Sequence, residues 1–337
     1  MGLILPISKC STLSTKRLGA RRFKITSSWN PGFNHCSVGD RAMAKLRDRW
    51  MEFQGIKNWE GLLGHLDDDL RKEILRYGKF TFPNLASSRS SWISYVAVCD
   101  DAKEIVRLWR RDVVIAYRGT TTSSEWLENF RATLSCLPDN ITTPDENYDQ
   151  PMVQSGLLSL YTTNTQCDQS LQDTIREEIS KIVDKYSDEP LSITIAGHSL
   201  GAAPATLTAC DITTKFSNAP IVSVVSFGGP RVGNKSFQCQ LEKSGTNVLR
   251  IVNSDDPVTK VPGFVIHDDI DDVAERGTTH VASTRMPSWL QKCMEDTQWV
   301  YAEVGKELRL SSKGDIATCH DLKTYLHLVT LVKNVQL

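Results

Sequence analysis

Short apolar runs alternate with segments of helical periodicity through the middle of the chain. The runs at 113–117, 191–196, 221–227 and 248–253 are rich in β-branched residues and predict buried strands. Helical patterns lie between them, at 170–186, from about 201 and at 234–243. Strands that alternate with helices predict an α/β fold with a mainly parallel sheet and right-handed crossovers.

The segments before the first buried run predict a different local organisation. Residues 42–78 carry apolar side chains at spacings that often fit one helical face, which predicts an N-terminal helical layer. Residues 92–98 and 104–109 predict a pair of strands. The segment 170–186 has the strongest helix signal, because a capping-box pattern starts it and an apolar stripe follows: Leu171, Ile175, Ile179, Ile182 and Tyr186.

The N-terminal segment differs in composition from the rest of the chain. Its first 39 residues contain six Lys and Arg, no Asp or Glu, and many Ser and Thr. The apolar stretch at 3–5 is too short for a secretory signal. This composition predicts an organelle transit peptide over residues 1–40, with a disordered basic tail as the alternative. Residues 41–337 are then expected to form one α/β domain.

Charge and cysteine usage exclude several classes of partner. Without those six basic residues, 33 Lys and Arg stand against 40 Asp and Glu, so residues 40–337 carry a net charge of −7. No nucleic-acid surface is implied. The nine cysteines include no C-x-x-C pair, which indicates reduced thiols; no metal or cofactor is predicted. No apolar run approaches the roughly 18 residues of a membrane span. The oligomeric state stays open.

A Gly-His-Ser-Leu-Gly segment, residues 197–201, stands between the run at 191–196 and an Ala-rich helical stretch. It matches the G-x-S-x-G nucleophile elbow in the strand–turn–helix context that gives this motif its meaning. The turn must be sharp for the serine to project above the sheet edge, and the two glycines let neighbouring backbone pass. Ser199 is therefore the candidate nucleophile.

A serine nucleophile needs a base, and the base needs an orienting acid. In hydrolases of this sheet type the partners follow in the order Ser, Asp or Glu, His, from loops at the carboxyl ends of strands. Asp255 and Asp256 follow the run at 248–253, and either can orient a histidine. His320 lies at a loop–helix boundary, and His327 stands two helical turns further on. Spacing favours His320 as the base. It does not decide between the two histidines or between the two aspartates.

Two groups are candidates for an oxyanion hole. The backbone N–H of Leu200 lies at the start of the helix after Ser199, where the helix dipole also favours negative charge. Thr120 follows an earlier core strand and can offer its N–H and its hydroxyl. An ordinary polar turn is the alternative for Thr120.

With these residues in place, the chain resembles the class 3 lipases. The resemblance rests on the Arg-Gly-Thr loop at 118–120, Trp126, the elbow at 197–201 and the Phe-Gly-Gly-Pro-Arg-Val-Gly-Asn segment at 227–234. Within that family it is most similar to the plant plastid phospholipase A1 acyl-hydrolases, through segments at 50–55, 58–63, 76–78, 125–130 and 319–322. The resemblance covers residues from about 44 to 328.

The resemblance implies an α/β-hydrolase fold with Ser199 as nucleophile, Asp256 as acid and His320 as base. It also implies an oxyanion hole formed by Thr120 and Leu200. The family pattern thus decides two choices that spacing left open.

A short amphipathic lid is implied just after the Arg-Gly-Thr loop, where Trp126, Leu127 and Phe130 would meet lipid. The implied substrates are membrane glycerolipids of the plastid, namely phospholipids and galactolipids cleaved at the sn-1 ester, with triacylglycerol as a further candidate. The implied location is the chloroplast, peripheral to a membrane or plastoglobule.

The chain departs from the family pattern at three points. The segment between 80 and 92 is shortened, the tail beyond 328 is atypical, and Pro204 is expected in the second turn of the elbow helix. Two other functions therefore stay open, a catalytically impaired regulatory or lipid-binding protein and a small-ester carboxylesterase. Retention of all three triad residues favours a hydrolase, and the apolar lid segment favours lipids.

Overall fold

The structure is a computed structural model that describes residues 48–64, 66–81, 94–119, 133–142, 150–164, 169–216, 220–262, 300–312 and 318–331. The predicted transit peptide at 1–40 and nearly all of the shortened segment between 80 and 92 lie outside these residues. So do Thr120 and the three expected lid residues, Trp126, Leu127 and Phe130.

A six-stranded sheet forms the centre of the molecule, in the order β1-β2-β5-β6-β7-β8. Its strands are β1 (Ser94–Val98), β2 (Arg111–Tyr117), β5 (Leu191–His198), β6 (Ile221–Phe227), β7 (Asn247–Asn253) and β8 (Lys306–Leu310). Only β1 runs antiparallel to its neighbour, and the other five strands are parallel. The mainly parallel α/β sheet predicted from the apolar runs is therefore confirmed.

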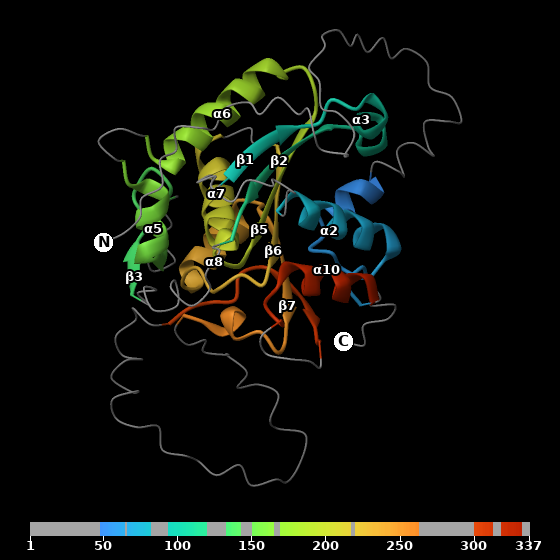
Figure 1. Ribbon diagram of the computed structural model, residues 1–337. Coiled ribbons are helices and arrows are strands. Elements are labelled where there is room, and N and C mark those ends of the chain that lie inside the picture. Colours follow the sequence, from blue (N-terminus) through green and yellow to red (C-terminus); the bar gives the residue numbers. More distant parts are fainter. Residues whose placement is uncertain are drawn as a thin grey trace, which may run out of the picture.

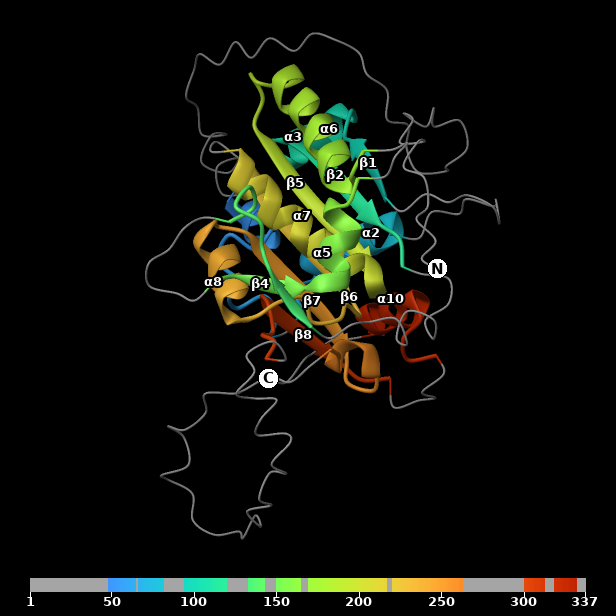
Figure 2. The same cartoon turned by 90° about the vertical axis from the view of Figure 1, so that its left-hand side faces the viewer.

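Helices cover both faces of this sheet (Figures 1 and 2). One face carries α5 (Ser155–Thr162), α6 (Leu171–Lys185), α7 (Ala202–Lys215) and α8 (Lys235–Lys243). The other face carries α2 (Asp68–Phe80) and α10 (Leu322–Leu331), which pack on each other and on the sheet. Because the strands alternate in side-chain direction, each face has its own apolar core: Ile115, Ile193 and Val224 belong to the first, and Val114, Ala196 and Val225 to the second.

The helix α6 forms as its sequence pattern predicts. The Ser170 hydroxyl accepts a hydrogen bond from the Asp173 N–H at 3.0 Å and donates to the Asp173 carboxylate at 2.7 Å. The stripe residues Leu171, Ile175, Ile179 and Ile182 are buried. The cap and the stripe together fix where this helix starts and which face it turns to the sheet.

The expected strand at 104–109 is wrong, because these residues belong to the helix α3 (Ala102–Leu108). The Asp101 carboxylate caps its start by accepting from the Lys103 N–H at 2.9 Å, and Trp109 ends it in the left-handed region at φ 57°. Of the apolar residues that suggested a strand, Val106 is 52% exposed and Leu108 is buried. The local cap thus outweighs the apolar character of this segment.

The N-terminal helical layer consists of two helical pieces rather than one continuous helix. Residues 48–53 are helical, turns follow, and α2 then begins after its N-cap Asp67. Five residues between the pieces have positive φ, namely Gly55, Asn58, Trp59, Gly61 and Leu66. The indole of Trp59 is buried at 2% exposure and donates to the Phe53 carbonyl at 2.9 Å, so this turn-rich connection still contributes to the core.

Four smaller elements complete the described part of the chain. The strands β3 (Leu134–Cys136) and β4 (Met152–Gln154) form a separate antiparallel pair. Short 3₁₀ helices follow two strands of the main sheet: η1 (Ser199–Gly201) comes after β5, and η2 (Pro257–Lys260) after β7. No described helix is long and apolar enough to cross a membrane.

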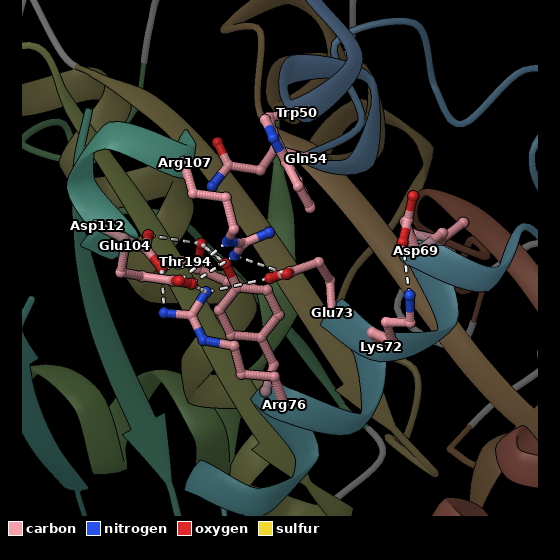
Figure 3. Close-up of polar contacts among 12 residues, drawn as sticks. Trp50, Gln54, Asp69, Lys72, Glu73, Arg76, Glu104, Arg107, Asp112 and Thr194 are labelled. Carbon is pink, nitrogen blue, oxygen red and sulfur yellow. Dashed lines mark hydrogen bonds and ion pairs between the residues drawn. The ribbon is translucent and has the colours of Figure 1, made fainter. Parts of the chain in front are cut away.

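A buried polar network joins α2 to the amino ends of β2 and β5 (Figure 3). The fully buried carboxylate of Asp112 accepts hydrogen bonds from the Tyr77 and Ser192 hydroxyls, both at 3.0 Å, and from Thr194 at 3.2 Å. An Arg76 guanidinium nitrogen lies 3.6 Å from it. Burial raises the pKa of Asp112 despite this cation. The network ties the helical layer to the end of the sheet opposite Ser199.

Removing the Asp112 carboxylate should destabilise the fold. The substitution Asp112→Ala removes the shared acceptor of three buried hydroxyls, while Arg76 keeps Glu73 and Glu104 as partners. Buried polar groups left without a partner cost about 1–3 kcal/mol of unfolding free energy each. The matched control is Asp69→Ala. Asp69 pairs with Lys72 on the exposed side of α2, where an ion pair contributes little. Urea denaturation of both variants checks this, and equal losses would contradict the role given to the network.

Candidate active site

Ser199 lies at the sharp turn between β5 and α7. Its backbone is in the left-handed region, with φ 56°. A Cβ on Gly197 would come within 2.4 Å of the Gly201 carbonyl oxygen, and a Cβ on Gly201 within 2.7 Å of the Arg118 carbonyl oxygen. Both glycines are therefore required by close backbone approaches, as the elbow motif predicts.

Pro204 does not interrupt the helix that follows this turn. Residues Ser199–Gly201 form a separate 3₁₀ turn, so α7 begins only at Ala202 and Pro204 is its third residue. It lies in the first turn rather than in the expected second, where helix N–H groups have no intrahelical partner to lose.

Three side chains meet at the carboxyl end of the sheet. The Nε2 atom of His320 lies 2.7 Å from Ser199 Oγ, and its Nδ1 atom lies 2.7 Å from Asp256 Oδ2. A carboxylate accepts hydrogen bonds, so Nδ1 carries the ring proton and donates it to Asp256. Nε2 is then left with a lone pair that accepts from the Ser199 hydroxyl. This chain of hydrogen bonds can withdraw a proton from the serine as its oxygen attacks.

Asp256 is held by more than the histidine. Its side chain is fully buried. The Tyr325 hydroxyl donates to Oδ2 at 2.6 Å, and the Val258 N–H donates to Oδ1 at 2.9 Å. Burial and the neighbouring carboxylate raise the pKa of Tyr325, so the phenol keeps its proton and remains a donor. Tyr325 was not predicted as a site residue. Its position five residues after His320, on α10, is the feature of the sequence that could have indicated it.

Comparison with known proteins identifies the family. The family model described as "Lipase (class 3)" matches residues 114–266. Phospholipase A(1) DAD1, a chloroplastic protein of Arabidopsis thaliana, is 48% identical over 87% of this chain and 78% of its own length. The chain belongs to the class 3 lipases. The family resemblance inferred from its motifs is thereby confirmed.

Two further similarities were found for this class 3 lipase. The galactolipase DONGLE, also chloroplastic and from Arabidopsis thaliana, is 32% identical over 83% of this chain and 69% of its own length. A solved Rhizomucor miehei lipase propeptide complex has a TM-score of 0.47 at 16% identity, covering 80% of this chain and 81% of that one.

The alternative residues lie elsewhere in this lipase. The Asp255 carboxylate accepts from the Ser312 N–H at 3.2 Å, the Ser312 hydroxyl at 3.0 Å and the Ser311 hydroxyl at 3.3 Å, and so holds the turn after β7 to the end of β8. His327 is exposed on α10. Geometry therefore places Asp256 and His320 with Ser199, and it places Asp255 and His327 outside this group.

Part of the expected oxyanion site is described. Leu200 directly follows Ser199 in the 3₁₀ turn that leads into α7. Gly119, the last described residue of the loop after β2, lies so close that a Cβ there would be 3.2 Å from Ser199 Cβ. Thr120 is the next residue along the chain, outside the described residues. Within the described ranges, no cluster of three or more His, Cys, Asp or Glu is arranged to hold a metal ion.

His198, the residue before the serine, also faces the triad. Its Nε2 atom lies 2.8 Å from the main-chain oxygen of His320, and the two imidazole centroids are 5.1 Å apart. Burial, followed by the neighbouring His320, lowers the pKa of His198 from 6.5 to about 4. His198 is therefore neutral at physiological pH.

Protonation of His198 should make the stability of the fold depend on pH. Between pH 6.5 and about 4 the unfolded chain binds a proton at His198 that the folded chain does not, so the unfolding free energy falls as the pH drops through this window. One such proton contributes a slope of up to about 1.4 kcal/mol per pH unit. His198→Gln should show a shallower fall in urea titrations. Equal slopes in the two proteins would contradict the lowered pKa.

Proposed function

We propose that this class 3 lipase hydrolyses the sn-1 acyl ester of membrane glycerolipids in the plastid. Family membership makes it a carboxylic ester hydrolase. The observation that carries the proposal is the continuous hydrogen-bonded chain from Ser199 Oγ through His320 to Asp256, with both links at 2.7 Å. A lipid-binding regulator without activity needs no such chain.

In the proposed reaction Ser199 attacks the ester carbonyl carbon while its proton passes to Nε2 of His320. The imidazolium that forms is stabilised by the buried Asp256 carboxylate at Nδ1. The oxyanion is stabilised by the N–H of Leu200, at the start of the elbow helix. Thr120, which follows β2 in the chain, is the second proposed donor. The tetrahedral intermediate then collapses, and His320 returns the proton to the leaving glycerol oxygen of the lysolipid.

The second half of the reaction repeats these steps with water. His320 removes a proton from a water molecule, whose oxygen attacks the acyl-enzyme carbonyl carbon. Collapse of the second intermediate releases the fatty acid, and the proton returns to Ser199 Oγ. The described side chains thus supply the nucleophile, the base and the acid for both halves.

The lipid class is supported by the relatives. DAD1 is a phospholipase A1 and DONGLE a galactolipase, so both phospholipids and galactolipids are proposed as substrates. Both relatives are chloroplastic, and the expected plastid location of this chain is confirmed by them. A transit peptide over residues 1–40 and a single domain over 41–337 remain predictions.

Removing the proposed nucleophile or base should abolish ester hydrolysis. Ser199→Ala and His320→Ala are each expected to lower kcat by about 10³-fold or more, because members of a triad act as a unit. The matched control is His327→Ala, since His327 is exposed on the helix that follows His320. Release of fatty acid from phospholipid and galactolipid vesicles is the measurement. Near-full activity in His320→Ala together with loss in His327→Ala would overturn the assignment of the base.

The proposed lid should act only on interfacial substrates. If Trp126 enters the lipid surface, Trp126→Ser loses a burial term of a few kcal/mol, and each 1.4 kcal/mol corresponds to roughly a tenfold effect. Activity on vesicles should fall much more than activity on a short, water-soluble ester. The melting temperature of the variant is the control. Equal losses on both substrates with a lowered melting temperature would show that Trp126 belongs to the core.

A further inference from the structure

The main-chain carbonyls of Cys319 and His320 are each hydrogen-bonded by a side chain, and the two side chains come from different strands. The Asn253 side-chain amide, at the end of β7, donates to the Cys319 carbonyl at 3.0 Å. The His198 ring, at the end of β5, lies with Nε2 2.8 Å from the His320 carbonyl. The backbone beneath the proposed base is thus attached to the sheet on both sides.

The direction of the His198 contact follows from elementary chemistry. A carbonyl oxygen can only accept, so the short contact requires a proton on Nε2 of His198, and Nε2 is the donor. Because the ring is neutral, Nδ1 carries no proton. Nδ1 faces the loop after β2, since a Cβ on Gly119 would lie 3.3 Å from it. The charged or titratable neighbours of the ring include His320, Asp256 and Asp321, and the Tyr325 ring centroid lies 6.2 Å from that of His198.

Asn253 is held in place by several hydrogen bonds besides the one to Cys319. It is fully buried, and its amide also donates to the Ser312 hydroxyl at 3.1 Å while its carbonyl accepts from the Ser312 N–H at 3.2 Å. Its own main-chain N–H donates to the Tyr325 hydroxyl at 3.2 Å. Asn253 therefore supports the base from the β7 side, and His198 is its counterpart on the β5 side.

We propose that His198 is a positioning residue for the general base, and that with Asn253 it holds the His320 backbone where the imidazole reaches both Ser199 and Asp256. The inference rests on the proposed function only in taking His320 as the base. His198 adjoins the nucleophile in the chain, so one short segment fixes both reacting partners. Loss of the His198 donor would leave Ser199 and the His320 imidazole at a longer or more variable distance.

A pair of substitutions of equal length separates donation from packing. Glutamine can place an amide N–H where the ring has Nε2–H, whereas methionine fills similar space without a donor. Displacement of a catalytic group by about 1 Å can cost about 100-fold in rate. For His198→Met we expect kcat on a short soluble ester to fall about 10- to 100-fold with little change in KM. His198→Gln should recover most of that loss.

Steady-state kinetics of the full chain is the first test, with the melting temperature measured for each variant. If His198→Met does not fold, His198→Phe serves as the second donor-free variant, since it keeps an aromatic ring. Equal kcat in the glutamine variant and in a folded donor-free variant would overturn the positioning role. A change confined to KM would overturn it as well.

Proton NMR provides a second test that needs no activity. The hydrogen bond between Nδ1–H of His320 and Asp256 should give a low-field resonance that Asp256→Asn alters. We expect this resonance to persist in the wild type and in His198→Gln, and to shift or broaden in His198→Met. An unchanged resonance in a folded donor-free variant would overturn the inference. A wild type that cleaves no ester but shows the expected NMR difference would overturn the proposed function and leave the positioning role supported.

Discussion

Ser199 stands in left-handed backbone at φ 56°, a conformation that L-residues seldom adopt. The chain can hold it there because Gly197 and Gly201 allow main-chain atoms to approach within distances that any side chain would block. The Arg118 carbonyl, at the end of β2, occupies the space beside Gly201. The turn therefore depends on β2 lying next to β5 in register, and the position of the proposed nucleophile depends on the sheet.

The same sheet brings the other partners to this turn. The carboxyl ends of parallel strands lie on one side of the sheet. Asp256 after β7 therefore lies near Ser199 after β5, although 57 positions separate them in the chain. His320 arrives from the segment before α10, and side chains from β5 and β7 hold its backbone. At the amino ends of the strands, the Asp112 network attaches α2 to the sheet, and α10 packs on α2. The helix that follows the proposed base is thus itself supported from the far end of the sheet.

The local patterns in the sequence predicted much of this arrangement, and the tertiary contacts lay beyond them. The elbow and the four central strands could be read because continuous apolar runs mark buried parallel strands. The edge strand β8 was missed, since its charged residues hide that pattern, and α3 was mistaken for a strand. Family resemblance chose Asp256 over Asp255, a choice that turn chemistry alone leaves open. Tyr325 and His198 were missed as partners of the site because their contacts join residues 69 and 122 positions apart.

Ser199 is the proposed nucleophile because His320 and Asp256 are placed to activate it, and covalent labelling tests this most directly. A fluorophosphonate probe reacts with a serine only when its hydroxyl is activated by a neighbouring base. Peptide mass spectrometry of the labelled wild-type chain should place the probe on Ser199. Ser199→Ala should take up no label, and His320→Ala should label far more slowly although its serine is intact. An unlabelled wild type, or equal labelling of the wild type and Ser199→Ala, would contradict the account.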